Sequence, residues 1–494
     1  MPTKIFGKNR LLKILFLAGI LFFAGGCRTK CVEGADNYPA CLGKKAAEKS
    51  EKTEILFWNL DDPSDAFAGQ IQAFQSQNPN VKIVYKKFEN EAEYENLLIN
   101  EMAEGGGPDI FALPDEAVWK HRRKLAPAPE NLIVPDKFRE TFFAVAADAL
   151  IFPDDDGFEK IYGVPLFIDT LAIYYNKAVF RDGLPSSDRP GNSWEEIKQQ
   201  TFELTKRDNS IERFALSGMA MGMAENIRSA TAIFSLLLLQ EKANLWDEKK
   251  TRSVFAAQKG TIEGTGKPFF PAAEALKLYT SFALPTYKNY SWNQMITALY
   301  PQQKELGVFA RGKTAMFFGF STTKKDLLAI IEGLRRSGID TIATADIGVA
   351  PVPQFSADDD PRKRDAFAHF TPLVVSRNSK NPELAWQFLL FLADTESAAE
   401  YHEKTGKPTA RKDLIEEQMT EKFVGIFARQ INYSKILPVL EKDDFDAIIR
   451  EMIDSVARGK ATVDAATKLA EKRLQCVLEK SEKKEIDRDC RQIR

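Results

Sequence analysis

Tyr162–Phe180, YGVPLFIDTLAIYYNKAVF, decides the fold, because it joins two extended segments through a polar break. Gly163 and Pro165 interrupt the first segment. Asp169 and Thr170 then separate it from a second run that is rich in β-forming residues. A polar break of this kind is typical of a hinge between two halves of a protein. The alternative is an ordinary strand with a polar bulge.

Length and composition indicate a large globular protein rather than a single small domain. The length of 494 residues is about three times that of a usual domain, so two large lobes or several domains are expected. The apolar fraction of 44% is that of a globular protein. The chain carries 68 basic and 70 acidic residues, and this balance gives no electrostatic reason to bind nucleic acid.

The first 26 residues have the composition of an export signal. Four Lys and Arg residues precede ILFLAGILFFAGG, a run of thirteen uncharged residues that is too short to span a bilayer. The run ends in Ala-Gly-Gly before Cys27, which resembles the lipobox of bacterial lipoproteins, in which the cysteine is lipidated. Ordinary signal cleavage and an uncleaved anchor are the alternatives. The mature chain is therefore expected outside the cytoplasm, with residues 27–53 as a flexible tether to the membrane.

The remaining cysteines also fit an exported protein. Cys31, Cys41, Cys476 and Cys490 are an even number and lie near the two termini. Pairing of Cys31 with Cys41 and of Cys476 with Cys490 is the simplest of the three possible connectivities. Neither pair has CxxC spacing and the three histidines are scattered, so no metal site is expected.

An alternation of strand and helix patterns begins at Ile55. Expected strands at 55–60, 81–88 and 109–114 are separated by segments with apolar residues at helical spacing. This alternation predicts a parallel sheet covered by helices. Ligands of such sheets bind beyond the carboxyl ends of the strands, which here are residues 58–62 and 113–116.

The order and spacing of these pieces resemble extracellular solute-binding protein family 1, the sugar-binding lipoproteins and periplasmic proteins of ABC importers, relatives of maltose-binding protein. The resemblance runs from about Ile55 to Leu474, and it is carried by ILFWNL, NPNVKIVY, GGGPDIFALP, YGVPLFIDTLAIYYNKAVF, SWEEI, FARGKTAMFFG, IGVAPVP and KNPELAWQFLLFLADTE. It implies an α/β fold of the periplasmic-binding-protein-like type II class, in which a multi-segment hinge joins two α/β lobes around a ligand cleft.

The resemblance also implies a division of the chain. The expected parts are lobe one over 54–168 and 320–369, a mostly helical lobe two over 170–317 and 372–475, and a C-terminal tail over 476–494. The expected hinge crossings are at 162–176, 316–320 and 368–372.

One segment, Gly307–Thr314, matches the phosphate-loop pattern GxxxxGK[ST]. A working phosphate loop follows a buried strand and opens a helix, whereas here the strand-like AMFFGF follows the motif. Nucleotide binding is therefore not predicted.

The expected cleft is lined by aromatic and polar side chains. Flat rings cover the apolar faces of a sugar, while carboxylates and amides pair with its hydroxyls. For the tryptophans a purely structural role is the alternative. Because the strand-end loops carry acids rather than arginines, we expect no phosphate ester. The three scattered histidines do not supply a metal site. We expect a neutral sugar, and the main rival is a polyamine, which acids beside aromatic rings would also hold. The candidate ligand-binding residues are Trp58, Asp61, Asp62, Asp115, Asp169, Thr170, Trp292, Phe320, Thr371 and Tyr433.

The sequence thus predicts a monomeric, membrane-anchored extracytoplasmic protein that is not an enzyme and needs no cofactor. It would capture a carbohydrate by hinge closure and deliver it to the permease subunits of an ABC importer. Two alternatives remain. A secreted glycoside hydrolase would need two carboxyl groups that face each other across the bound bond. A sensing lipoprotein would present the bound solute to a receptor instead.

Overall fold

The structure, a computed structural model, describes residues 52–60, 62–63, 65–208, 213–298, 302–355, 360–482 and 489–493. The predicted signal peptide, Cys27, Cys31, Cys41 and Asp61 lie outside the described residues. Within the described part of the chain, no helix has the length and apolar character that crossing a membrane requires.

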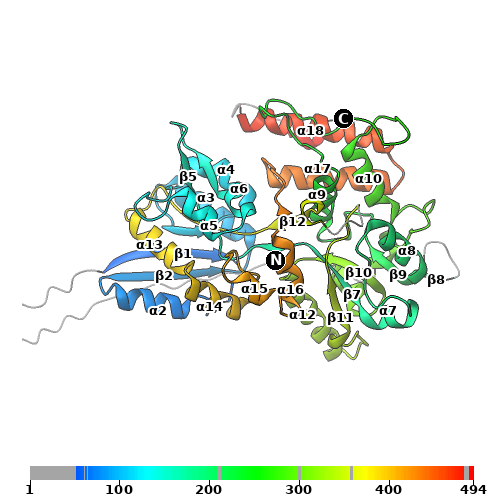
Figure 1. Cartoon of the computed structure of the whole chain (residues 1–494), viewed down its shortest axis with the longest axis horizontal. Coiled ribbons are helices and arrows are strands. Elements are labelled where there is room, and N and C mark those ends of the chain that lie inside the picture. The colour runs from blue at the N-terminus through cyan, green and yellow to red at the C-terminus, as the bar shows by residue number, and fades with distance from the viewer. Residues whose placement is uncertain are drawn as a thin grey trace, which may run out of the picture. The chain divides into compact units, whose positions relative to one another are not determined.

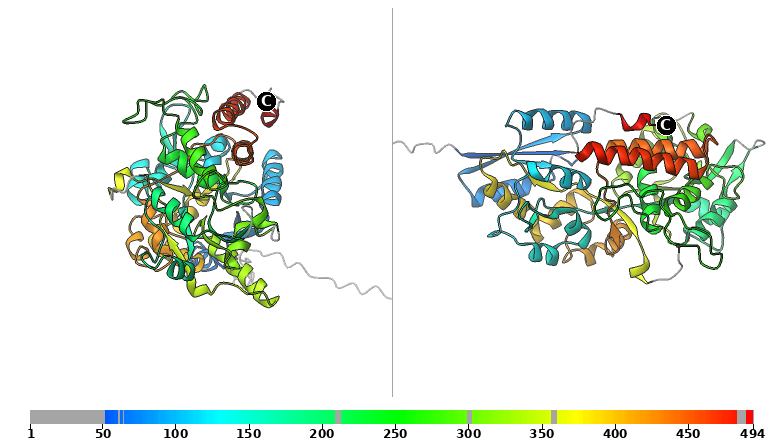
Figure 2. Two further views of the ribbon diagram at one scale, coloured as in Figure 1. Left: turned by 90° about the vertical axis from the view of Figure 1, so that its right-hand side faces the viewer. Right: turned by 90° about the horizontal axis from the view of Figure 1, so that it is seen from above.

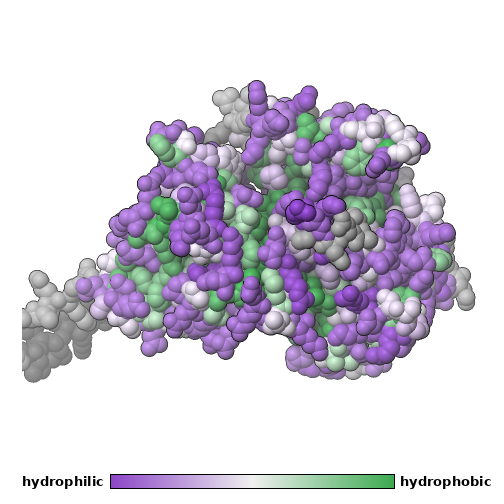
Figure 3. All heavy atoms as spheres, in the orientation of Figure 1, coloured by the Kyte–Doolittle hydropathy of each residue, from purple (hydrophilic) through white to green (hydrophobic). Residues whose placement is uncertain are grey.

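Two hydrophobic cores divide residues 53–494 into two lobes. The first core collects buried residues from 55–168 and 368–415, and the second collects buried residues from 171–366 and 437–490. Figure 1 shows the first lobe around β1, β2 and α13 and the second around β7, β9 and β10. Hydrophilic residues cover most of the visible face of both lobes (Figure 3). The chain therefore passes from one lobe to the other three times.

The first lobe is built on a four-stranded sheet in the order β13-β3-β1-β2, in which only β13 runs antiparallel. The ring of Phe57, in the middle of β1, lies 5.1 Å from that of Phe67 and 6.0 Å from that of Phe388, so aromatic packing fixes the covering helices. The elements of this lobe are β1 (Thr53–Leu60), α2 (Ala68–Gln77), β2 (Val81–Phe88), α3 (Glu91–Ala103), β3 (Ile110–Ala112), α4 (Asp115–His121), α5 (Pro135–Thr141), α6 (Ala144–Leu150), β4 (Ile151–Pro153), β5 (Glu159–Ile161), β13 (Leu373–Val375), α13 (Pro382–Leu392), α14 (Thr395–Thr405) and α15 (Ile415–Gln418).

The second lobe is built on a five-stranded mixed sheet in the order β11-β7-β10-β9-β8. The rings of Tyr174 in β7 and Phe317 in β10 stack at a centroid distance of 4.9 Å. Its elements are β7 (Ala172–Asn176), α7 (Lys177–Gly183), α8 (Trp194–Leu204), β8 (Lys206–Arg207), β9 (Phe214–Ala220), α9 (Ala230–Gln240), α10 (Pro271–Ser281), α11 (Lys304–Ala310), β10 (Thr314–Gly319), α12 (Thr323–Arg336), β11 (Ile347–Ala350), α17 (Lys442–Ala457) and α18 (Val463–Glu482).

The segment that matches the phosphate-loop pattern has the opposite order of elements. Helix α11 covers its first half, Gly312 turns the chain with a φ of 68°, and strand β10 begins at Thr314. The backbone therefore runs from helix to strand, so no helix begins where the phosphates would bind.

The three crossings between the lobes form one small sheet, in the order β14-β12-β6. Strand β6 (Asp169–Thr170) is antiparallel to β12 (Ala366–His369), which is parallel to β14 (Ser434–Lys435). Helix α16 (Val424–Ile431) lies beside this sheet and contributes Phe427 to the second core and Ile431 to the first. We call these three strands the hinge sheet.

Two of the expected boundaries were wrong. Residues 323–350 belong to the second lobe, because β10 is buried along its whole length between β7 and β9, and β11 pairs with β7. Residues 373–415 belong to the first lobe, because β13 pairs with β3 and α13 packs in the first core. Residues 316–319, most of the segment that was expected to cross between the lobes at 316–320, therefore lie in the central strand of the second lobe's sheet. The crossing that the sequence analysis did not predict is β14.

The chain ends in the second lobe, where α17 and α18 run side by side (Figure 2). A disulfide joins Cys476 in α18 to Cys490 near the C-terminus. This is one of the two local pairs that the cysteine spacing suggested. It fixes the segment around Cys490 to helix α18 of the second lobe.

Candidate functional site

A cavity of about 860 Å³ lies between the two lobes, at the point where β1 ends and the hinge sheet begins. The first lobe contributes the turn after β1, Leu166, Phe167 and the loop after α14. The second lobe contributes the start of α12, and the segment around Phe423 closes one side. A ligand held here touches both lobes.

An ion pair between Asp62 and Lys407 forms part of the first lobe's wall. The Lys407 ammonium lies 2.6 Å from Asp62 Oδ1 and 4.2 Å from the centre of the Phe167 ring. The Asn59 amide donates to Asp62 Oδ2 at 2.8 Å, and the Tyr401 hydroxyl lies within 3.1 Å of both carboxylate oxygens. Because both carboxylate oxygens are engaged by protein groups, Asp62 holds the loop in place rather than offering a free acid.

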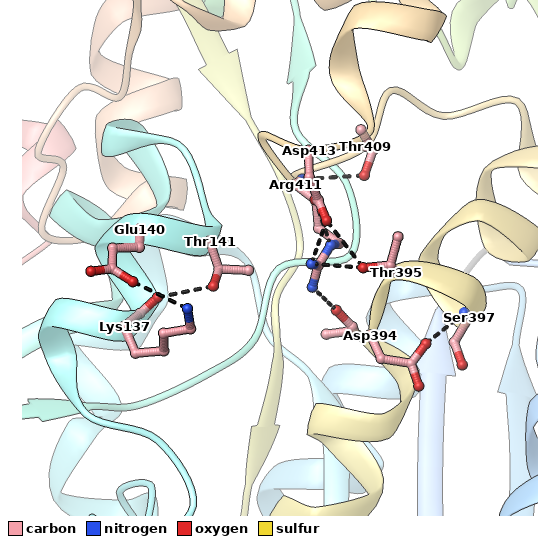
Figure 4. Close-up of polar contacts among 10 residues, drawn as sticks. Lys137, Glu140, Thr141, Asp394, Thr395, Ser397, Thr409, Arg411 and Asp413 are labelled. Carbon is pink, nitrogen blue, oxygen red and sulfur yellow. Dashed lines mark hydrogen bonds and ion pairs between the residues drawn. The ribbon is translucent and has the colours of Figure 1, made fainter.

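The loop that carries Lys407 is anchored from both sides. Gly406 ends α14 in the left-handed conformation, with a φ of 68° that favours glycine, and turns the chain back toward the cavity. Ile168 then donates its backbone N–H to Pro408 at 3.1 Å. Farther along, Arg411 forms a two-pronged pair with Asp413 and also reaches Thr395 (Figure 4).

Asp169 links the hinge sheet to the second lobe. Its carboxylate accepts from the backbone N–H and the hydroxyl of Ser321, at 2.9 and 2.7 Å, and from the N–H of Thr322 at 3.3 Å. Burial raises the pKa of Asp169, although these hydrogen bonds oppose the shift. The side chain therefore caps the start of α12 and fixes it against the first hinge strand.

A second group of charges surrounds His369 at the end of β12. The ring nitrogen Nδ1 lies 2.8 Å from Asp115 and 3.6 Å from Glu116, and Lys442 of α17 lies 3.4 Å from Glu116. Burial alone would lower the pKa of His369, but the two carboxylates raise it to about 10. Burial and Glu116 raise the pKa of Asp115 to about 6. For Glu116, burial opposes the shift, but His369 and Lys442 hold the pKa well below its usual range.

The ligand atoms of Asp115, Glu116 and His369 lie within 4.8 Å of one another, so the group has the spacing of a metal site. However, His369 Nδ1 already bonds Asp115, and Lys442 supplies a positive charge beside Glu116. The group is therefore best described as a balanced ion-pair network that joins α4, the hinge sheet and α17.

Aromatic rings supply the apolar part of the cavity wall. Tyr401 and Phe167 come from the first lobe, and Phe320 and Phe423 come from the second lobe and the approach to α16. Phe320 and Phe423 are only partly buried, so their rings are available to a ligand. Rings beside hydroxyl, amide and charged groups suit a ligand that has both apolar faces and many hydroxyls.

Four of the predicted site residues line this cavity, namely Asp62, Asp169, Phe320 and Thr371. Asp115 lies behind the wall, where it pairs with His369. Thr170 is fully buried and donates its hydroxyl to the Phe427 carbonyl at 3.1 Å.

The predicted aromatic residues other than Phe320 pack in the protein interior instead. Trp58 lies 5.2 Å from the Phe88 ring and is 9% exposed. Trp292 is fully buried, and its ring N–H donates to Asn226 at 2.9 Å. Tyr433 packs against the second core, and burial raises its pKa to about 12. In this structure these three side chains therefore stabilise the protein interior rather than line the cavity.

Several residues of the wall were missed by the sequence analysis. Phe167 lies within the decisive stretch, one residue before the end of its first strand-like segment, but nothing distinguishes it there from a core residue. Lys407 follows a helix-ending Gly, which is a local signal for a turn but not for a site. Lys324 and Lys404 look like ordinary solvated lysines of helices in the sequence.

Comparison with known proteins identifies the family. The model of the bacterial extracellular solute-binding protein family matches residues 58–399 of this chain. The chain belongs to this family. This solute-binding protein is therefore extracytoplasmic, and the cavity between its lobes is its candidate solute site.

Individual relatives are distant but cover nearly the whole protein. The galactooligosaccharide-binding protein of Bacillus subtilis (strain 168) is 21% identical over 442 residues, which are 87% of this chain and 91% of that protein. A cyclic α-maltosyl-1,6-maltose binding protein from Arthrobacter globiformis has a similar structure, with a TM-score of 0.66, 18% identity, and coverage of 87% and 99%. The sugar-binding protein MalE of Xanthomonas citri has a TM-score of 0.64, 19% identity, and coverage of 87% and 98%. These likenesses show that the fold is the predicted type II class.

Proposed function

We propose that this protein captures a saccharide between its two lobes and delivers it to an ABC importer. The observation that carries the proposal is the cavity itself, whose wall combines aromatic rings with hydrogen-bonding groups from both lobes. A pyranose ring presents apolar C–H faces and a rim of hydroxyls, and both find partners on such a wall. The relatives named above, which bind galactooligosaccharide and maltose-type sugars by their descriptions, support the same class of ligand.

We further propose that lipidated Cys27 anchors the protein to the membrane as a monomer. The AGGC sequence after a short apolar run supports the anchor. The tether over residues 27–53 would leave the two lobes free to reach the permease subunits.

A binding role suits the carboxylates of the cavity better than hydrolysis. A glycoside hydrolase needs one carboxyl to donate a proton and a second to attack or to activate water. Asp62 is held by Lys407 and two hydrogen-bond donors, and Asp169 is held by the start of α12. Both acids already serve the architecture of the site.

A thermal-shift screen of the purified protein against a panel of mono- and oligosaccharides tests the proposal. A cognate saccharide at a hundred times its dissociation constant adds about 2.7 kcal/mol of stability, which raises the melting temperature measurably. Phe320→Ala should weaken binding by about 1–3 kcal/mol through lost apolar contact. Phe202→Ala, at an exposed ring outside the cavity, is the matched control and should leave binding unchanged. The proposal fails if no saccharide shifts the melting temperature.

A further inference from the structure

The charged groups of the cavity wall are unevenly paired, and this bears on which saccharide the proposed function concerns. Four acids and four lysines line the cavity, so a count of charges alone suggests a neutral site. The contacts of the individual groups give a different result.

Each of the four acids is already engaged by the protein. Asp62 pairs with Lys407, and Asp169 accepts hydrogen bonds from Ser321 and Thr322. The other two also have partners: Asp326 lies 3.1 Å from Arg228, and Glu421 lies 2.8 Å from His402. A cationic ligand would compete with these internal partners at Asp62 and Asp169, and it would meet an already engaged carboxylate at Asp326 and Glu421.

Three of the four lysines have no such partner. Among the residues that the structure describes, no carboxylate forms an ion pair with Lys324, Lys325 or Lys404. The Lys324 ammonium lies instead 4.2 Å from the centre of the Phe423 ring, which itself lines the cavity. These three lysines are therefore the charged groups of the wall that are left for a ligand to pair with directly.

The position of Lys324 and Lys325 strengthens this point. Both lie in the first turn of α12, where the positive end of the helix dipole disfavours cations and where acidic residues are usual. Asp326 of the same turn pairs with Arg228, so the two lysines add to the positive potential at this end of the helix. Lys404 lies near the end of α14 in the other lobe, so positive charge faces the cavity from both sides.

We propose that the saccharide bound here is acidic and carries the carboxylate groups of a uronic acid. Its carboxylates pair with Lys324, Lys325 and Lys404, while its ring faces lie against Phe320 and Phe423. Two features that favour phosphate are missing, because no described arginine lines the cavity and Asp169 occupies the backbone amides of Ser321 and Thr322 just before α12. The expectation of a neutral sugar rested on the acids in the sequence, and it did not foresee that each acid has an internal partner.

Titration calorimetry of the full protein with matched oligosaccharides tests this inference. The two members of each pair have the same sugar configuration and linkage and differ only in whether C6 is oxidised to a carboxylate. One pair is α-1,4-linked trigalacturonate and α-1,4-linked galactotriose, and further pairs have the gluco and manno configurations. We expect the best acidic trimer to bind at least about tenfold more tightly than its neutral partner at low salt, since unscreened charges attract. Raising the salt from about 50 to about 500 mM should remove most of that advantage.

Single-residue variants identify which lysines pair with the carboxylates of the ligand. Lys324→Gln and Lys404→Gln should each weaken binding of the acidic trimer several-fold and reduce its salt dependence, while Lys380→Gln, an exposed lysine of the first lobe away from the cavity, should change neither. Tighter binding of neutral trimers without salt dependence would overturn the inference and leave the proposed function intact. If no member of any pair binds, the proposed function fails as well.

Discussion

At the scale of single residues, the ion pair of Asp62 and Lys407 is the contact that most directly shapes the cavity. Their side chains are 5% and 14% exposed, so removal of one partner leaves a charge that water cannot reach. We expect Lys407→Met to lower the free energy of unfolding by about 3 kcal/mol, because the Asp62 carboxylate loses the cation that pairs with it. Urea unfolding measures this change.

Two further variants separate the ion pair from a general effect of losing a lysine. Lys404→Met, three residues earlier and exposed, should change stability by less than about 0.5 kcal/mol. Combining Asp62→Asn with Lys407→Met should recover much of the loss, because no buried charge is then left alone. If Lys407→Met lowered the free energy of unfolding no more than Lys404→Met does, the ion pair would contribute little to stability.

His369 makes the stability of the protein depend on pH. Its pKa is about 10 in the folded protein, whereas an ordinary histidine has a pKa of 6.5. The stabilisation that its positive charge contributes is therefore fully present below pH 6.5 and is lost as pH rises through 10. The facing charges are Asp115, Glu116 and, beyond them, Lys442. We therefore expect His369→Gln to be less stable than the wild type at pH 7, with a difference that shrinks toward pH 10.

The control for this titration is His121→Gln. Burial lowers the pKa of His121 to about 4, so this ring is neutral both at pH 7 and at pH 10. The stability difference between wild type and this variant should not change over the same range. A constant difference for His369→Gln as well would refute the assigned role of the carboxylates.

The local pattern of the sequence indicates which segments come near the cavity, but not which distant partner each side chain meets. Asp62 was proposed because ligands bind beyond strand ends, and Asp169 because it lies in the polar break of the expected hinge; both line the cavity. The sequence did not reveal that Asp62 meets Lys407, which lies 345 residues later. It also could not distinguish a buried tryptophan such as Trp292 from one that lines a cleft, because both need an apolar surrounding.

At the scale of elements, Gln430 of α16 ties the hinge together. Its side-chain amide donates to the Thr170 hydroxyl at 3.1 Å and to the Leu171 carbonyl at 3.0 Å, and its oxygen accepts from the Val352 N–H at 2.9 Å. The residue is fully buried, so truncation leaves these groups without partners. We expect Gln430→Ala to cost at least about 2 kcal/mol of stability, as measured by urea unfolding.

Asn432→Ala is the matched control, since this exposed amide ends the same helix and should contribute little. If Gln430→Ala were as mild as the control, the amide would not be what holds α16 to the hinge sheet.

The strand pattern of the sequence predicted the elements better than their pairing. AMFFGF was correctly expected to be a strand, but its central place in the second sheet depends on β7 and β9, which lie more than ninety residues before it. Strand β14 is only two residues long and has no apolar alternation, so no pattern could mark it as a crossing.

At the scale of the whole molecule, the proposed anchor determines where the protein works. We expect Cys27→Ser to move the protein from the membrane fraction to the soluble exported fraction, because the lipidated side chain is lost. Fractionation followed by immunodetection measures the distribution, and Cys31→Ser, a few residues along the chain, is the control that should stay at the membrane. Membrane retention of Cys27→Ser would contradict lipidation at this residue.

The central claim is that a saccharide binds between two lobes that close around it through the hinge sheet. Small-angle X-ray scattering tests it most directly, with the saccharide that gives the largest thermal shift. The account predicts that the radius of gyration decreases when this saccharide saturates the protein. An unchanged radius of gyration, with binding confirmed by calorimetry in the same sample, would contradict it.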